Sequence, residues 1–184
     1  YEHESNYARF ALYTLYFPHI TQGPISRYNR LGAELKKPLK VTYSGVTFGL
    51  QRILWGCFKK MVIADRVLMY TTSVFSSAYR EGALYLAGLF FDVIYIYSDF
   101  SGYMDIVLGV GQQFGVRMDE NFKTPYFATS IRDFWQRWHI TLSTWLRDYV
   151  YIPLGGSRKG TFRKCINQMI TMLISGIWHG TGAT

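Results

Sequence analysis

The sequence predicts an all-α, multi-pass membrane protein with re-entrant and interfacial helices. Of its 184 residues, 49% are hydrophobic and only 17% are charged, below the roughly 25% charged residues usual in soluble domains. Apolar tracts recur along the chain and are interrupted by glycine, proline or charged residues. Helical spacing of apolar residues is also clearer than the two-residue alternation of strands. We therefore expect a helical core that is not built from simple membrane crossings.

Five apolar tracts account for most of the predicted helices. They cover residues 10–25, 41–58, 61–79, 83–116 and 165–178. A simple crossing needs about 20 mostly apolar residues, whereas interrupted tracts suit re-entrant, tilted or interfacial helices that protein shelters. Tract 41–58 carries Arg52 and has basic residues at both ends, so we expect it to be re-entrant or to lie on the membrane surface.

Basic residues gather in short segments between the apolar tracts. These segments are 27–40, the pair Lys59 and Lys60, and the glycine-rich run 155–164. The positive-inside rule places them on the cytoplasmic side of a membrane. Although the net charge is +8, the basic residues do not follow one helical face, so no nucleic-acid partner is expected.

The two ends and the cysteines set the expected domain organisation. The chain begins at Tyr1 without an initiator methionine and stops at Thr184 just after an apolar tract. We expect residues 1–184 to be the central part of a single membrane domain, truncated at both ends. Cys57 and Cys165 are too few and too far apart in sequence for a disulfide framework or a metal site, and no metal is expected.

A capping box predicts that a helix begins at about Ile131. Ser130 and Asp133 are spaced so that their side chains satisfy free amides of the first helical turn. Apolar residues then follow the spacing of one helical face until Pro153. They are Phe134, Trp138, Leu142, Trp145 and Tyr149. We expect a short amphipathic helix at an interface or in a packed core.

Glycine spacing predicts close helix packing and excludes a nucleotide fingerprint. Gly45 with Gly49 and Gly111 with Gly115 have the GxxxG spacing that permits close contact of membrane helices. Gly115 lies one position too late to complete GxGxxG, and no strand–turn–helix unit surrounds it. The sequence also lacks GxSxG, HExxH and Walker motifs, which excludes several common hydrolase and nucleotide sites.

Two of the four histidines are candidates for catalysis. His179 ends an apolar tract between glycines that leave room for a substrate, and a histidine at membrane depth is usually functional. His139 lies beside Trp138 on the predicted amphipathic helix, where a buried imidazole is either structural or catalytic. Imidazole can accept a proton from a hydroxyl and pass it to a leaving thiolate. His19 is expected to be an interface residue.

Three acids interrupt the longest apolar tract, 83–116. They are Asp92, Asp99 and Asp105. Acids in such a tract usually face a cavity or pair with a cation. For Asp92 and Asp99, which are seven residues apart and share a helix face, two uses stay open: they line a polar passage or orient a histidine, or they pair with arginine. The candidate arginines are Arg132, Arg137 and Arg147.

Four stretches together resemble the bacterial membrane-bound O-acyltransferase (MBOAT) family. They read FPHITQGPISRY at 17–28, DFSGY at 99–103, DFWQRWHITLSTWLRDYVYIPLGG at 133–156 and SGIWHG at 175–180. Members that O-acetylate alginate are the nearest type, and members that D-alanylate teichoic acid are more distant. The third stretch is long and specific, and the resemblance covers nearly the whole chain.

The resemblance implies a ring of membrane helices around a thin central floor in the cell membrane. The family's histidines match His139 and His179, which are carried over as catalytic. Further motif residues are carried over as supporting positions. They are Asp99, Trp135, Arg137, Trp138, Arg147, Asp148, Asn167 and Trp178.

The implied reaction moves an acyl group from a thioester donor on the cytoplasmic side to hydroxyls of an extracytoplasmic polysaccharide. Resemblance to the members that O-acetylate alginate implies that the acyl group is acetyl. Acetyl-CoA or an acyl carrier protein is the expected donor and is a substrate, with no permanently bound cofactor. The expected partners are the bilayer, the donor and the polysaccharide, reached through an extracytoplasmic acetyltransferase. The alternatives are a flippase-like carrier, a scaffold that recruits a soluble acetyltransferase, and D-alanyl transfer to teichoic acid.

Overall fold

The structure is a computed structural model that describes residues 4–20, 22–76 and 82–180. Throughout these ranges the regular elements are helices and no strand is present, which confirms the predicted all-helical class. The chain divides into two compact units, Tyr1–Glu120 and Asn121–Thr184. The expectation that residues 1–184 belong to a single domain stays a prediction.

Short helices begin the first unit. They are α1 (Tyr7–Thr14), α2 (Phe17–Ile20), the π-helix η1 (Tyr28–Gly32) and α3 (Ala33–Leu35). Asn6 caps α1 by accepting the amides of Ala8 and Arg9, as polar residues do at helix starts. A small core of Tyr16, Leu31 and Val116 lies among these helices.

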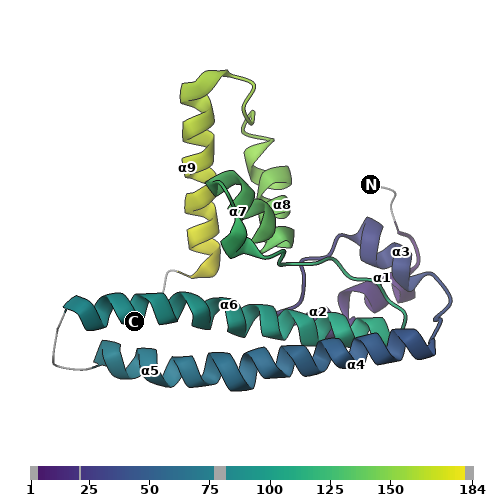
Figure 1. The fold of residues 1–184 in the computed structure, drawn as a ribbon. Coiled ribbons are helices and arrows are strands. Elements are labelled where there is room, and N and C mark those ends of the chain that lie inside the picture. The colour runs from purple at the N-terminus through teal and green to yellow at the C-terminus, as the bar shows by residue number, and fades with distance from the viewer. Residues whose placement is uncertain (1–3, 21, 77–81, 181–184) are drawn as a thin grey trace. The chain divides into compact units, whose positions relative to one another are not determined.

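A long helical hairpin forms the rest of the first unit (Figure 1). One side is α4 (Tyr43–Cys57), the π-helix η2 (Phe58–Ala64) and α5 (Asp65–Ser76), which follow one another without interruption. The other side is α6 (Gly82–Gln113), against which all three elements pack. The sequence placed Lys59 and Lys60 in a segment between two tracts. Both lysines lie within the continuous helical run, so no break in the helix separates the two tracts.

Glycines let α4 and α6 approach backbone to backbone. A Cβ atom on Gly49 would lie 2.7 Å from the carbonyl oxygen of Gly109, and one on Gly56 would lie 2.5 Å from that of Gly102. The reciprocal distances, from Gly109 to Gly49 and from Gly102 to Gly56, are 2.6 and 2.9 Å, so the helices run antiparallel with matched glycines seven residues apart. Close packing was predicted, but it uses this spacing rather than the GxxxG pairs. Gly115 instead follows α6 with a φ of +73°.

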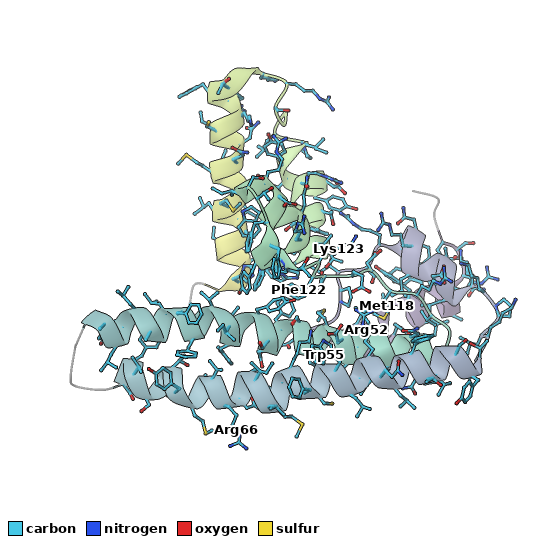
Figure 2. All side chains as sticks on the ribbon, viewed as in Figure 1. Arg52, Trp55, Arg66, Met118, Phe122 and Lys123 are labelled. Carbon is cyan, nitrogen blue, oxygen red and sulfur yellow. The ribbon has the colours of Figure 1, made fainter. Side chains whose placement is uncertain are left out.

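Ion pairs join the two sides of the hairpin. Asp99 lies 2.6 Å from Lys60, and Asp105 lies 2.5 Å from Lys59 and 2.9 Å from Arg52. Arg52, labelled in Figure 2, also forms a bidentate pair with Glu120. The acids Asp99 and Asp105 therefore pair with cations, but not with the predicted arginines. Their partners are Arg52, Lys59 and Lys60, which lie on the other side of the hairpin.

Within the described ranges, α6 is the one helix long and apolar enough to cross a membrane. Its 32 residues span about 48 Å at 1.5 Å per residue, more than the roughly 30 Å thickness of a hydrocarbon core. The predictions of a multi-pass protein and of a re-entrant segment at 41–58 stay predictions.

The second unit contains the predicted amphipathic segment. Its elements are η3 (Pro125–Phe127), α7 (Ile131–Arg137), α8 (Ile140–Leu146), the π-helix η4 (Arg147–Tyr151) and α9 (Gly160–His179). The start at Ile131 is confirmed, since the Ser130 hydroxyl accepts the Asp133 amide. The Asp133 carboxylate accepts the amide of Thr129 rather than that of Ser130. The continuous helix predicted beyond this start was wrong, because the helix is interrupted between Arg137 and Ile140.

Candidate active site

The interruption of the helix is centred on His139. Trp138 is extended, with φ −104° and ψ 128°, and His139 is left-handed, with φ 41° and ψ 55°. A left-handed residue other than glycine costs roughly 1–2 kcal/mol. Strained backbone of this kind clusters at functional sites, and it ends the helical face that the spacing from Phe134 predicted. The strain therefore marks His139 as a candidate functional residue.

A cavity of about 720 Å³ in the second unit brings both candidate histidines together. α7 and α8 supply one part of its wall and α9 supplies another. Its apolar lining includes Ile131, Leu142, Leu146 and Met172. Its polar lining includes Ser143, Thr144, Gln168, Thr171 and Ser175, and its cationic lining is Arg132 and Arg147. Among the described residues, no carboxylate lines the cavity.

Burial keeps the His139 imidazole neutral. The residue is only 9% exposed, and this burial, together with the nearby His179, lowers the pKa of His139 to about 4. Desolvation disfavours the charged form, and a second cation would disfavour it further. At neutral pH, His139 therefore presents one N–H donor and one acceptor nitrogen to its surroundings.

His179 is the last residue of α9 and is exposed. Its Nδ1 lies 2.7 Å from the carbonyl oxygen of Ser175, one turn earlier. Because a carbonyl oxygen only accepts, Nδ1 must donate, and this fixes the tautomer. In the neutral imidazole the lone pair then resides on Nε2, where it can accept a proton. The geometry thus gives His179 the protonation pattern of a general base.

Three of the predicted supporting residues line the cavity. Trp135 and Trp138 come from α7 and the interruption that follows it, and Arg147 is the first residue of η4. The Trp138 ring stacks on Phe134 at a centroid distance of 5.6 Å and meets the edge of Phe122 at 5.1 Å. These contacts hold the indole beside His139. Arg147 is exposed and donates to Asp148 at 2.8 Å.

The other predicted supporting residues lie outside the cavity lining. Asn167 is fully buried and donates to the carbonyl of Gly156 at 2.9 Å, which ties α9 to the turn before it. Arg137 pairs with Asp133 at 2.7 Å. Trp178 is 57% exposed and meets His179 edge to face at 4.8 Å. Asp148 pairs with Arg147, and Asp99 belongs to the first unit.

Sequence reasoning missed the polar row on α9. Gln168, Thr171, Ser175 and His179 all line the cavity, and their spacing of three or four residues places them on one helical face. The row lies largely within residues 165–178, a segment that the sequence analysis described only as an apolar tract. A search for polar residues at helical spacing before His179 would have found it.

A metal centre is not formed by the described part of the chain, where no group of three or more His, Cys, Asp or Glu side chains comes together. Cys57 is half-buried, Cys165 is exposed, and both are free thiols. The chemistry of the cavity must therefore be considered from its imidazole, indole, hydroxyl and guanidinium groups.

These features define a helical protein whose candidate site is a cavity with two histidines. The chain belongs to the membrane-bound O-acyltransferase family, MBOAT, whose family model matches residues 2–184. This result confirms the resemblance seen in the sequence.

Relatives from three bacteria show the range of the family. A Pseudomonas putida protein named "Probable alginate O-acetylase AlgI" is 42% identical over 180 residues, covering 97% of this chain and 37% of the relative. The peptidoglycan O-acetyltransferase of Helicobacter pylori is 36% identical, with 98% and 35% covered. The teichoic acid D-alanyltransferase of Bacillus subtilis is 30% identical, with 94% and 46% covered. The chain thus spans less than half the length of each of these relatives.

Proposed function

We propose that this chain carries the histidine site of a multi-pass O-acyltransferase in the cell membrane. The observation that carries the proposal is the single cavity of about 720 Å³ lined by both His139 and His179. Two imidazoles in a largely apolar cavity can move a proton and stabilise developing charge without a carboxylate.

The tautomer assigns different roles to the two histidines. Nε2 of His179 takes the proton from an acceptor hydroxyl, and the oxygen attacks the carbonyl carbon of the thioester. The N–H of His139 donates to the oxyanion that forms, assisted by the indole N–H of Trp135 or Trp138. The carbon–sulfur bond then breaks, and His179 returns the proton to the leaving thiolate. A neutral imidazole with a lowered pKa serves as such an electrophilic donor in other enzymes.

The proposed acyl group is acetyl, delivered by acetyl-CoA or an acyl carrier protein from the cytoplasmic side. The relatives support this choice, because those named for O-acetylation are 36–42% identical and the teichoic acid D-alanyltransferase is 30% identical. The proposed acceptor is an extracytoplasmic polysaccharide hydroxyl, reached through a partner acetyltransferase outside the membrane. The thioester is a substrate and no cofactor remains bound.

Transfer of a labelled acetyl group tests the proposal. Membranes with the full-length protein would be supplied with labelled acetyl-CoA or acetylated carrier protein, with the partner acetyltransferase and with the polysaccharide. Wild type would be compared with His139→Ala and His179→Ala at matched expression. His19→Ala is the matched control, since His19 is half-buried in α2 of the first unit.

We expect transfer by the wild type and the control and a strong loss in both site variants. Loss of a general base typically lowers turnover about 10²–10⁴-fold. A carrier would move an intact substrate without consuming thioester. Acetyl transfer that persists undiminished in both site variants would therefore contradict the histidine mechanism, and polysaccharide movement without thioester consumption would favour the carrier.

A further inference from the structure

The segment before η3 replaces hydrogen bonds that the helix loses at His139. In a continuous helix, the amides of Ile140 and Thr141 would each donate to a carbonyl four residues earlier. Instead, Ile140 donates to the backbone carbonyl of Asn121 at 3.0 Å, and Thr141 donates to the Asn121 side-chain oxygen at 3.1 Å. The Arg137 carbonyl, which Thr141 would have used, accepts the amide of Lys123 at 2.9 Å.

Asn121 is the centre of this arrangement. The residue is fully buried, and its side-chain oxygen also accepts the Thr141 hydroxyl at 2.6 Å. One residue therefore satisfies two of the amides that begin α8. The neighbouring Phe122 and Lys123, labelled in Figure 2, continue the same segment. Such satisfaction of the first amides is normally the task of the residue that precedes a helix.

His139 occupies that preceding position but does not cap the helix. Its side chain makes no capping hydrogen bond to α8 and lines the cavity instead. The amides at the start of α8 would otherwise compete for a side chain at this position. Asn121 accepts the amides of Ile140 and Thr141 in its place.

We propose that Asn121 is a positioning residue that holds His139 in its left-handed conformation, facing the cavity. The competing state is a continuous helix through residues 138–139, which the apolar spacing from Phe134 to Tyr149 favours. The inference rests on the proposed function for its kinetic consequence. Its structural consequence, the burial of His139, can be measured without any acyl transfer.

The experiment uses the purified full-length protein in detergent with Asn121→Ala, Asn121→Asp and Thr141→Val. Asn121→Asp keeps the acceptor oxygen, and Thr141→Val removes only the hydroxyl bond. Thr71→Val is the matched control, because Thr71 is also a buried threonine whose hydroxyl donates a hydrogen bond, in its case to the backbone carbonyl of Leu68 in α5. Three quantities are measured: kcat and KM for acetyl-CoA, the thermal midpoint, and the rate at which diethyl pyrocarbonate modifies His139, followed by peptide mass.

We expect Asn121→Ala to lower kcat about 100-fold with little change in KM, the size of effect that a small misplacement of a reacting group produces. Its His139 should be modified at least about tenfold faster than in the wild type. Asn121→Asp should recover most of both properties, and Thr141→Val should show a smaller change of the same sign. Thr71→Val should leave the modification rate of His139 unchanged.

The outcomes separate positioning from simple stabilisation. Wild-type protection of His139 in both Asn121→Ala and Thr141→Val would overturn the proposal. Equal failure of Asn121→Ala and Asn121→Asp would overturn it as well, since the acceptor oxygen would then not matter. If Asn121→Ala does not fold, Thr141→Val decides by the same modification rate. Absence of acetyl transfer in the wild type would count against the proposed function, while the protection of His139 would still test the role of Asn121.

Discussion

Lys59 and His139 are almost equally buried, 8% and 9% exposed, but the surroundings of their side chains differ between the two compact units. In the first unit, Lys59 lies 2.5 Å from the carboxylate of Asp105, which also binds Arg52. In the second unit, no carboxylate among the described residues lines the cavity that contains His139, and burial keeps its imidazole neutral. Lys59, paired with a carboxylate, stabilises the helical hairpin. His139, as a neutral imidazole, has one donor and one acceptor nitrogen.

The difference between Lys59 and His139 distinguishes two kinds of buried ionisable group. A buried charge with an oppositely charged partner is satisfied and contributes to the architecture of the unit. A buried imidazole in a cavity that no described carboxylate lines is kept neutral, with one donor and one acceptor nitrogen. Variants in the first unit should therefore change stability, and variants in the cavity should change turnover.

The largest expected effect on stability is that of Asp105→Asn. The substitution leaves Lys59 buried without its carboxylate and weakens the contact with Arg52. Loss of one partner from a buried ion pair typically costs about 3–5 kcal/mol. The thermal midpoint of the purified full-length protein measures the loss. An unchanged midpoint would mean that the ion pair does not stabilise the hairpin.

A pH series gives the next effect, and it arises in the second unit. The pKa of His139 is lowered to about 4 in the folded chain. As pH falls, His139 therefore binds a proton near pH 6.5 in the unfolded chain but only near pH 4 in the folded chain. The free energy of unfolding should therefore fall as pH falls from about 6.5 to 4, and His139 should contribute about 1.4 kcal/mol per pH unit to this fall. Above about pH 6.5, His139 should not change the free energy of unfolding. The difference in unfolding free energy between wild type and His139→Gln, measured across this range, checks the slope. Parallel pH curves would show that His139 is not buried in its neutral form.

Packing of the hairpin should respond to Gly56→Ala. The added methyl group would lie 2.5 Å from the carbonyl oxygen of Gly102, so the helices must separate locally. Overpacking of this kind costs about 1–3 kcal/mol. Gly176→Ala is the matched control, since a Cβ on Gly176 of α9 meets nothing within 4 Å. Equal thermal midpoints for the two variants would argue against the close approach of α4 and α6.

The smallest expected effect is that of Asp65→Asn. Asp65 also contacts a lysine, Lys60, at 2.8 Å, but both side chains are more than 40% exposed. Exposed ion pairs contribute about 0–1 kcal/mol. The thermal midpoint should therefore change far less than in Asp105→Asn. A loss as large as that of Asp105→Asn would show that exposure does not separate the two ion pairs.

The sequence predicted the features that depend on neighbouring residues. The all-helical class and the helix start after Ser130 follow from local spacing, and both are confirmed. The two histidines were selected for their surroundings in the sequence, and the structure places both in one cavity. Their catalytic roles remain a proposal.

The sequence failed where distant residues decide the local structure. The helix was predicted to pass through His139 because the apolar spacing continues there. It is interrupted because Asn121 and Lys123, well before that position, replace its hydrogen bonds. The sequence also shows Lys59 and Lys60 only as a short basic segment between two apolar tracts, without indicating whether the helix continues. The helix continues there because Asp105 and Asp99 on α6 neutralise both lysines.

One paired measurement tests the separation of roles most directly: acetyl transfer and thermal midpoint of the same full-length preparations of wild type, His179→Gln and Asp105→Asn. The account predicts that His179→Gln loses about 10²–10⁴-fold in turnover with an unchanged midpoint. It predicts that Asp105→Asn has a clearly lower midpoint, while the protein that remains folded retains turnover. Full acetyl transfer by a folded His179→Gln protein would contradict the account.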